Sequence, residues 1–147
     1  MKADHRLAHL VKDARRAMER ALQVRLATHD VAFGHWTYLR ILWENDGLTQ
    51  RELSALAGVM EPTTFGALRA MEARGYIERR QRPDNRKSVY IHLTRKGRAL
   101  EAKLVPLAEE VNRAAVRGMT REDVATLRTL LHAVVENLDG DRKERDG

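Results

Sequence analysis

Apolar residues recur at steps of three and four along most of the chain, and this spacing predicts a mainly helical protein. A first helix is predicted from residue 3 to about residue 28, and a second over HWTYLRILWEN, after a loop that contains Gly34. The period changes to two in YIERRQ and SVYIHL, which predicts two β-strands joined by the turn RPDNRK. The predicted fold class is mainly α with a small β hairpin (α+β).

Two shorter helices, LTQRELSALAG and EPTTFGALRAMEARG, precede the hairpin and carry their own boundary signals. Thr49 with Glu52 predicts a capping box, and Gly58 predicts a left-handed end to the first of them. Pro62 suits the first position of the second. The residues expected to face inwards are Leu53, Leu56, Ala57, Phe65, Leu68 and Met71. Two helices joined by so short a turn form a helix-turn-helix, whose second helix enters a DNA major groove.

The C-terminal third is predicted to form two more helices. Thr94 begins the first, and Pro106 inside its apolar stripe predicts a kink near residues 104–107, because proline removes a backbone hydrogen bond. Thr120 with Asp123 begins the last helix, whose apolar residues continue at near-heptad spacing to Leu138. The charged residues 140–147 have nothing to bury and are predicted to be disordered.

The first and last helices carry more apolar surface than the edge of so small a monomer can bury. We therefore predict a two-fold homodimer, with residues 1–32 and 98–139 as its helical dimerisation region and residues 33–97 as the DNA-binding lobe of one structural domain. Such a dimer presents two second helices to successive major grooves. The alternative is a monomer whose terminal helices pack on its own hairpin.

The cationic surplus of the chain is concentrated around the hairpin. The net charge is +6, and residues 69–98 carry ten Lys or Arg against three Asp or Glu, whereas the remainder carries 17 against 18. A cationic patch that coincides with a helix-turn-helix predicts binding to the phosphates of double-stranded DNA. The alternative interpretation is an ordinary solvated basic face.

Several motifs of this region occur together in the MarR family of winged helix-turn-helix regulators, which the chain resembles over roughly residues 30–100. They are LTQRELSALAG, the EPTT start of the second helix, the run from Leu68 to Ile77, Asp84-Asn85-Arg86, and Leu93-Thr94 followed by Gly97. Each motif alone is weak, but their combination is specific. The resemblance implies a transcriptional regulator whose wing inserts Arg86 into the minor groove, oriented by Asp84.

Specific roles can be predicted for the residues that contact DNA. Thr63 and Thr64 are placed for base edges or thymine methyls, Gly66 for close approach of the helix, and Arg69 for a phosphate or a guanine. No charged or amide side chain lies between Thr63 and Ala67, so base specificity is expected to depend more on the wing and on DNA shape. The full predicted set is Thr49, Gln50, Arg51, Pro62, Thr63, Thr64, Gly66, Arg69, Arg82, Asp84, Asn85, Arg86 and Lys87.

A ligand site is the second functional prediction. On a helical wheel Arg40 falls beside Trp36 and Trp43, and two aromatic walls with a guanidinium suit an aromatic carboxylate. The other interpretation is that both tryptophans are core and that Arg40 stacks over an indole. Tyr38 and Arg16 complete the candidate set. The resemblance places ligands in this zone, where the first two helices meet the DNA-binding lobe.

Other chemistries find little support in the sequence. His5 and His9 lie four apart on one helix, but no carboxylate at that spacing completes a zinc site. The absence of cysteine excludes disulfides and thiol switches, and no catalytic motif is present, so we expect no enzyme, metal or cofactor. Without a bilayer-spanning run or a signal-peptide core, the protein is expected in the cytoplasm.

These observations predict a sequence-specific transcriptional regulator. Its simplest mechanism is a repressor that a small anionic, aromatic ligand releases from a pseudo-palindromic operator. The alternative function is a winged-helix module that binds a partner protein and no DNA.

Overall fold

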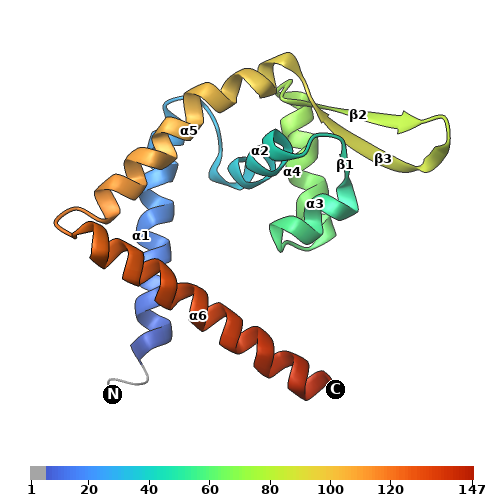
Figure 1. Ribbon diagram of the computed structural model, residues 1–147. Helices are drawn as coiled ribbons and strands as arrows, with labels where there is room; N and C mark the ends of the chain where they lie inside the picture. The colour runs from blue at the N-terminus through green and yellow to red at the C-terminus, as the bar shows by residue number, and fades with distance from the viewer. Residues whose placement is uncertain (1–5) are drawn as a thin grey trace. The chain divides into compact units, whose positions relative to one another are not determined.

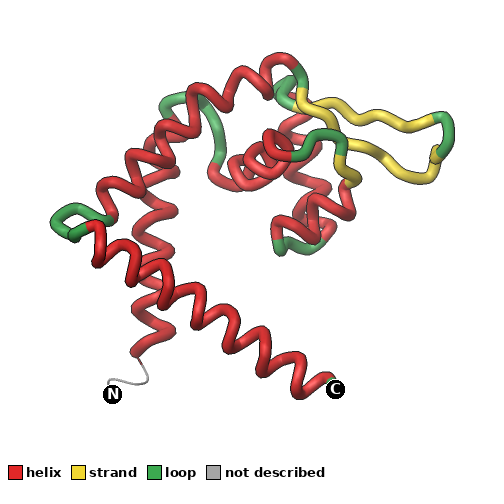
Figure 2. Tube along the Cα trace, viewed as in Figure 1, coloured by secondary structure: helices red, strands yellow, loops and turns green. Residues whose placement is uncertain are grey.

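The computed structural model describes residues 6–147, which form six helices and one three-stranded sheet (Figure 1 and Figure 2). In chain order the elements are α1 (Leu7–Ala27), α2 (Phe33–Glu44), β1 (Leu48–Thr49), α3 (Gln50–Ala57), α4 (Glu61–Ala73), β2 (Ile77–Arg82), β3 (Asn85–Leu93), α5 (Arg95–Ala115) and α6 (Arg121–Asp146). The predicted fold class, mainly α with a small β hairpin, is confirmed.

The chain divides into two compact units, Met1–Val111 and Asn112–Gly147. The first unit contains the helix-turn-helix, the sheet and the hydrophobic core, whereas no side chain of α6 is buried. The apolar stripe of the last helix, which the sequence analysis assigns to a dimer interface, is thus exposed in the single chain, and one structural domain overall stays a prediction.

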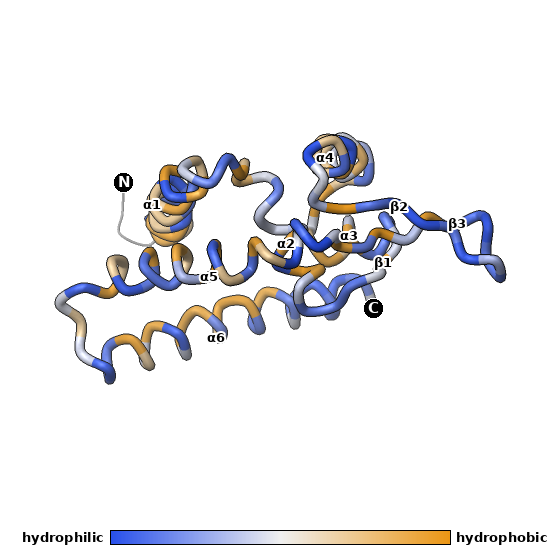
Figure 3. The backbone as a smooth tube through the Cα atoms, turned by 90° about the horizontal axis from the view of Figure 1, so that it is seen from above, coloured by the Kyte–Doolittle hydropathy of each residue, from blue (hydrophilic) through white to orange (hydrophobic). Residues whose placement is uncertain are grey.

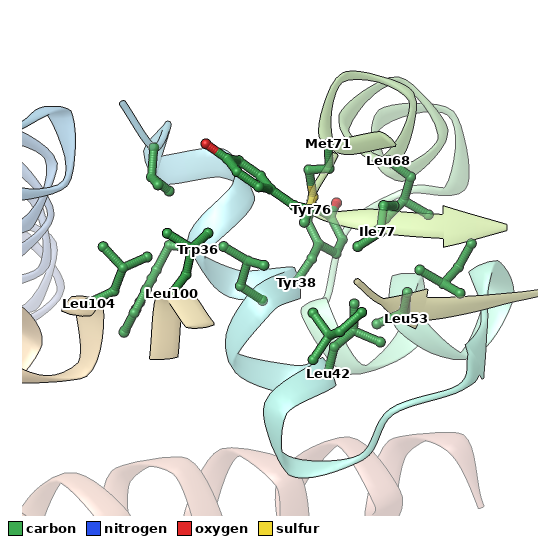
Figure 4. Packing of buried hydrophobic residues seen from close by; sticks show 14 of the residues in the cluster. Trp36, Tyr38, Leu42, Leu53, Leu68, Met71, Tyr76, Ile77, Leu100 and Leu104 are labelled. Atoms are coloured by element: carbon green, nitrogen blue, oxygen red, sulfur yellow. The ribbon is translucent and has the colours of Figure 1, made fainter. Parts of the chain in front are cut away.

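The core of the first unit is built from α2, α3, α4 and the sheet, and α5 adds to it (Figure 4). Leu42, Leu53, Leu68 and Ile91 come from four different elements and are all fully buried. Each such side chain contributes about 1.5–3 kcal/mol to folding. Leu104 extends the same cluster into α5. These contacts hold the helix-turn-helix and the sheet in one arrangement.

The sheet is antiparallel, with β3 in the centre between β1 and β2. The strand β1 has only two residues, too few for an alternating pattern, so the sequence predicts the hairpin alone. Arg82 pairs with Asn85, which shortens the predicted turn to Pro83 and Asp84. The register shifts at this end of the hairpin, between Gln81 and Arg82. The two long strands extend beyond α3 and α4 as a wing (Figure 1).

The Leu93-Thr94-x-x-Gly97 motif joins the sheet to α5. The Oγ1 atom of Thr94 accepts a hydrogen bond from the backbone N–H of Gly97 at 3.1 Å and donates one to the carbonyl of Gly75 at 2.5 Å. Position 97 requires glycine, because a Cβ there would lie 2.1 Å from the carbonyl oxygen of Tyr76. The motif therefore caps α5 and lets its first turn lie against the residues that begin β2.

Asp46 connects the end of α2 to both β3 and α5. Its Oδ1 accepts a hydrogen bond from the backbone N–H of Leu93 at 2.8 Å, and its Oδ2 accepts one from Arg98 at 2.8 Å. We expect Asp46→Ala to lower the free energy of unfolding by about 1–3 kcal/mol, because it leaves a part-buried N–H unpaired. Urea denaturation measures this loss. The control Asp141→Ala removes an exposed ion pair with Arg145 and should cost under about 0.5 kcal/mol; equal losses would contradict the prediction.

The imidazole of His35 is buried at the start of α2, and its Nδ1 has no hydrogen-bond partner. Burial lowers the pKa of His35 below its usual value, and the nearby Arg74 lowers it further. Below a pH of about 6.5 the unfolded chain therefore binds more protons than the folded chain, and stability falls. We expect a lower melting temperature at acidic than at neutral pH, and a smaller difference in His35→Gln. His29 is exposed, and His29→Gln is the control. If it reduced the difference in melting temperature equally, burial of a histidine would not be the cause.

Apolar side chains remain exposed on α1 and α6, and Figure 3 shows hydrophobic bands that recur along α6. On α1 they include Leu7, Leu10, Val11 and Met18, and on α6 they are Leu127, Leu130, Leu131, Val134, Val135 and Leu138. Within residues 6–147, no helix combines the length and apolar composition of a membrane span.

The C-terminal residues 140–146, for which the sequence predicts disorder, are helical in the structure. The helix α6 continues to Asp146, and an ion pair of 3.4 Å joins Arg145 to Asp141 one turn earlier. Adding a residue to an existing helix costs less conformational entropy than starting a new helix. Charged residues that contact no hydrophobic core can therefore continue α6. The helix α5 is continuous through Pro106, and the kink there stays a prediction.

Candidate nucleic-acid interface

The first helix of the helix-turn-helix has the cap at Thr49 and the end at Gly58 that the local signals predict. Thr49 accepts a hydrogen bond from the backbone N–H of Glu52 at 3.1 Å, and the Glu52 carboxylate accepts one from the backbone N–H of Thr49 at 3.2 Å. Gly58 ends α3 in the left-handed conformation, with φ of 66°. Pro62 is the second residue of α4, one position later than predicted. This reciprocal cap leaves the side chain of Thr49 engaged within the protein.

The inward face of α4 differs from the predicted one. Thr64 is fully buried with Leu68 and Met71, whereas Phe65 is 41% exposed. The Thr64 hydroxyl lies 2.9 Å from the hydroxyl of Tyr38 and shares a hydrogen bond with it. The prediction that Thr64 contacts base edges is therefore wrong, as is the inward placement of Phe65. Helical spacing could have predicted the burial of Thr64, because Thr64 and Met71 are seven residues apart, close to two full turns, and so lie on the same face of α4.

The inward face of α3 also differs from the predicted one. Leu56 is 62% exposed, whereas Ser54 is buried beside Leu53. Residues 50, 53, 54 and 57 share one face of α3 at about 100° per residue, and Leu56 lies outside this face. The inward placement of Leu56 is wrong, while that of Leu53 is confirmed.

The outward face of α4 is short of charged and bulky polar groups. Pro62, Thr63, Gly66 and Arg69 are all exposed, and a Cβ added at Gly66 would meet nothing within 4 Å. With about 100° between successive residues, Gly66 and Arg69 lie roughly opposite the buried stripe. The face is therefore smooth enough for close approach to a DNA groove, with Arg69 as its cation.

The wing presents cations at its tip. Arg82, Arg86 and Lys87 are exposed, and the guanidinium carbon of Arg82 lies 3.8 Å from the ring centroid of Tyr90. This stacking orders a side chain that would otherwise be free to rotate. Asn85 instead supports the turn, since its side chain accepts from the backbone N–H of Lys87 at 3.3 Å. It also donates to the hydroxyl of the serine three residues later, at 3.1 Å.

The contact implied for Asp84 is not found. Asp84 is exposed, and no ion pair between it and Arg86 occurs among the described residues. Gln50 is partly buried and Arg51 exposed at the start of α3, where phosphate contacts are predicted.

Several cations of the basic region, residues 69–98, are paired with carboxylates of the same chain. Carboxylates pair with Arg74, Arg79, Arg80 and Arg98. The described ion pairs include none for Arg69, Arg82, Arg86 or Lys87. The outward face of α4 and the wing tip therefore carry uncompensated positive charge, which can attract phosphates.

The tryptophans do not form the predicted ligand slot. Trp36 is buried, and its ring centroid lies 5.7 Å from that of Trp43 at an interplanar angle of 71°, so the rings touch edge to face and leave no space for a third ring. The indole N–H of Trp43 donates to the carbonyl of Gly97 at 3.0 Å. Arg40 is exposed and, within the described residues, stacks on neither indole. The geometry agrees with the alternative that both tryptophans belong to the core.

Arg16 lies apart from these aromatic residues, in a pocket of about 390 Å³. The pocket is lined by Asp13, Arg16, Glu19, Arg20 and Gln23 of α1 and by Phe33 of α2. Two guanidinium groups and one phenyl ring line it, groups that can contact a small aromatic acid, and the carboxylates of Asp13 and Glu19 lie beside them. The sequence placed Arg16 in the candidate set but missed Phe33, because the two are distant in the chain.

The zinc hypothesis finds no support in residues 6–147, where no group of three or more potential metal ligands is close together. His5, half of the proposed pair, lies outside the described residues.

Comparisons with known proteins agree on one family. The MarR family profile matches residues 34–89. The HTH-type transcriptional regulator TtmR of Methylorubrum extorquens (strain PA1) is 34% identical over 88% of this chain and 69% of its own. The homoprotocatechuate degradative operon repressor of Escherichia coli is 27% identical over 78% of this chain and 82% of its own.

A solved structure extends the agreement to three dimensions. A MarR family regulator from Listeria monocytogenes, crystallised with a 26mer DNA, has a TM-score of 0.82 and 26% identity, covering 96% of this chain and 92% of its own. The named relatives are transcriptional regulators and not enzymes, in agreement with the prediction. The winged helix-turn-helix, its basic wing and these relatives together place the chain in the MarR family of DNA-binding transcriptional regulators.

Proposed function

We propose that the protein is a homodimeric repressor that binds a pseudo-palindromic operator and is released from it by a small anionic, aromatic effector. In this mechanism α4 enters the major groove and the wing inserts Arg86 into the adjacent minor groove. Pro62, Thr63, Gly66 and Arg69 face the bases. Thr49, Gln50, Arg51, Arg82 and Lys87 lie along the phosphates.

The observation that carries DNA recognition is the distribution of unpaired charge. Arg69 on α4 and Arg86 on the wing are exposed in the same compact unit and have no ion pair among the described residues, while Arg79 and Arg80 on β2 are paired with carboxylates. An uncompensated cation releases condensed counterions when it meets a phosphate, which favours binding. A patch evolved only for solubility would not need its free cations at the two places that a winged helix presents to DNA.

The exposed apolar stripes of α1 and α6 support the dimer. Soluble monomers rarely expose a contiguous apolar surface of this kind, and a second copy offers an identical surface to cover it. We assign residues 1–32 and 98–139 to this interface and residues 33–97 to the DNA-binding lobe. Two-fold symmetry then doubles the recognition surface and accounts for a pseudo-palindromic operator.

The pocket that contains Arg16 is the proposed effector site. It lies on α1, which also carries part of the proposed dimer interface, so an occupant there can change the spacing of the two DNA-binding lobes. Affinity for DNA then falls by the coupling free energy between the two sites. The Escherichia coli relative is a degradative operon repressor, which supports repression as the direction of control.

The proposal is tested by gel-shift titration against the promoter of its own or a neighbouring gene, together with sedimentation of the free protein. We expect a dimer that binds one site, with an affinity that falls steeply as salt increases. Benzoate and related aromatic acids should raise the melting temperature in proportion to the logarithm of their concentration and weaken the gel shift. A monomer, or equal binding to all duplexes, would contradict the proposal.

A further inference from the structure

The helix α4 has few side chains with which to read bases. Its charged residues are Glu61, Arg69 and Glu72, and burial of Thr64 leaves Thr63 as its only exposed hydroxyl. Arg69 is the one cation of α4, and it lies on the outward face. An arginine that donates two hydrogen bonds to O6 and N7 of guanine is the commonest specific contact in the major groove. Base recognition by α4 therefore depends heavily on where the guanidinium of Arg69 points.

Phe65 lies one turn before Arg69 and has no role in the core. Its ring is 41% exposed, although residues of this type are usually buried. The guanidinium carbon of Arg69 lies 5.7 Å from the ring centroid, and that of Arg79 lies 5.1 Å from it. Both distances fall within the range of cation–π attraction. The ring thus contacts one cation from α4 and one from β2.

The second cation is already held in place. The Nε atom of Arg79 lies 3.4 Å from a carboxylate oxygen of Glu72, and the Nε and Nη2 atoms of Arg79 are buried. Arg79 is therefore part of the partly buried surface between α4 and the sheet. The ring of Phe65 lies against it, whereas Arg69 is exposed and has no carboxylate partner among the described ion pairs.

We infer that Phe65 is a positioning residue for base recognition, whose ring holds the Arg69 guanidinium in the direction from which it reads a guanine. The inference rests on the proposed placement of α4 in the major groove. A free arginine side chain loses rotamer entropy when it binds a base, and a contact that restricts it beforehand reduces that loss. The effect of Phe65 should therefore appear at the base that Arg69 contacts and nowhere else in the operator.

The test is selection of binding sites from a randomised DNA pool by the full-length protein, followed by sequencing. The variants are Arg69→Ala, Phe65→Leu, which keeps the apolar bulk, and Phe65→Tyr, which keeps the ring. We expect Arg69→Ala to remove a guanine preference at one position of each half-site, by about tenfold or more. Phe65→Leu should weaken the same preference about two- to fivefold, and Phe65→Tyr should restore it. The other positions of each half-site should keep their preferences in both Phe65 variants.

The remaining outcomes contradict the inference in distinguishable ways. If Phe65→Leu retained the full preference at the position lost in Arg69→Ala, the ring would not position the guanidinium. If Phe65→Leu altered a different position, the ring would contact a base directly. If the unaltered protein enriched no motif at all, the proposed function itself would fail. Because Phe65 is exposed, the leucine variant should keep the melting temperature of the parent, which circular dichroism checks.

Discussion

Replacing Leu131 by glutamate is expected to produce a monomer and to lower the affinity for operator DNA by about a hundredfold or more, since linking two binding sites commonly raises avidity by 10²–10⁴. Leu131 lies within the exposed apolar stripe of α6, among residues that the proposed dimer buries. A carboxylate placed in a buried interface without a partner loses its hydration and opposes association. Sedimentation velocity and gel-shift titration measure the two effects on the same preparation.

Thr129→Glu is the matched control for this variant. Thr129 lies on the same helix two residues earlier, which places it on the opposite side of α6, and its side chain is exposed. The Thr129→Glu variant adds the same charge in the same turn of α6 but should leave the protein dimeric. If Leu131→Glu remained a dimer with unchanged DNA affinity, the α6 stripe would not form the dimer interface.

Removing the Arg86 side chain is expected to produce the second large effect. Arg86→Ala should lower operator affinity by about tenfold or more, because an arginine in a groove typically contributes about 1–3 kcal/mol. A dimer carries two copies, so the slope of the logarithm of affinity against the logarithm of salt concentration should become shallower by about two. Gel-shift titrations at four or more salt concentrations give both values.

Arg142→Ala tests whether the loss of any cation has this effect. Arg142 is exposed near the end of α6, outside the residues assigned to the dimer interface, and its removal changes the net charge of the chain by the same amount. It should leave the salt slope nearly unchanged. An Arg86→Ala protein with the affinity and salt slope of the parent would show that the wing does not enter the minor groove.

Local patterns in the sequence predicted helix starts and ends well. The capping boxes at Thr49 and Thr120 and the left-handed Gly58 appear as predicted. Each involves residues at most three positions apart, so no distant part of the chain is needed to form them. Alternation in the hairpin is equally local, and only the two-residue strand β1 was too short to be recognised.

The candidate site was only partly predictable, because the inner and outer faces of α4 depend on distant partners. The sequence placed Phe65 inside on hydrophobicity and Thr64 outside on polarity, and both assignments were wrong. A buried hydroxyl is tolerated when it has a hydrogen-bond partner, and Tyr38 provides one. The two tryptophans show the same limit, since a helical wheel gives their common face but not their direct contact with each other.

For this protein, the sequence by itself determined the order of the elements, the helix caps and the cationic wing, because these follow from residues that are neighbours in the chain. Which side chains of α4 face the core was decided only by the tertiary structure. The partner of Thr64 is 26 residues away on another helix, and the neighbours of Phe65 include an arginine of the sheet. Burial depends on what the folded chain places beside a residue, so no local pattern could have supplied it.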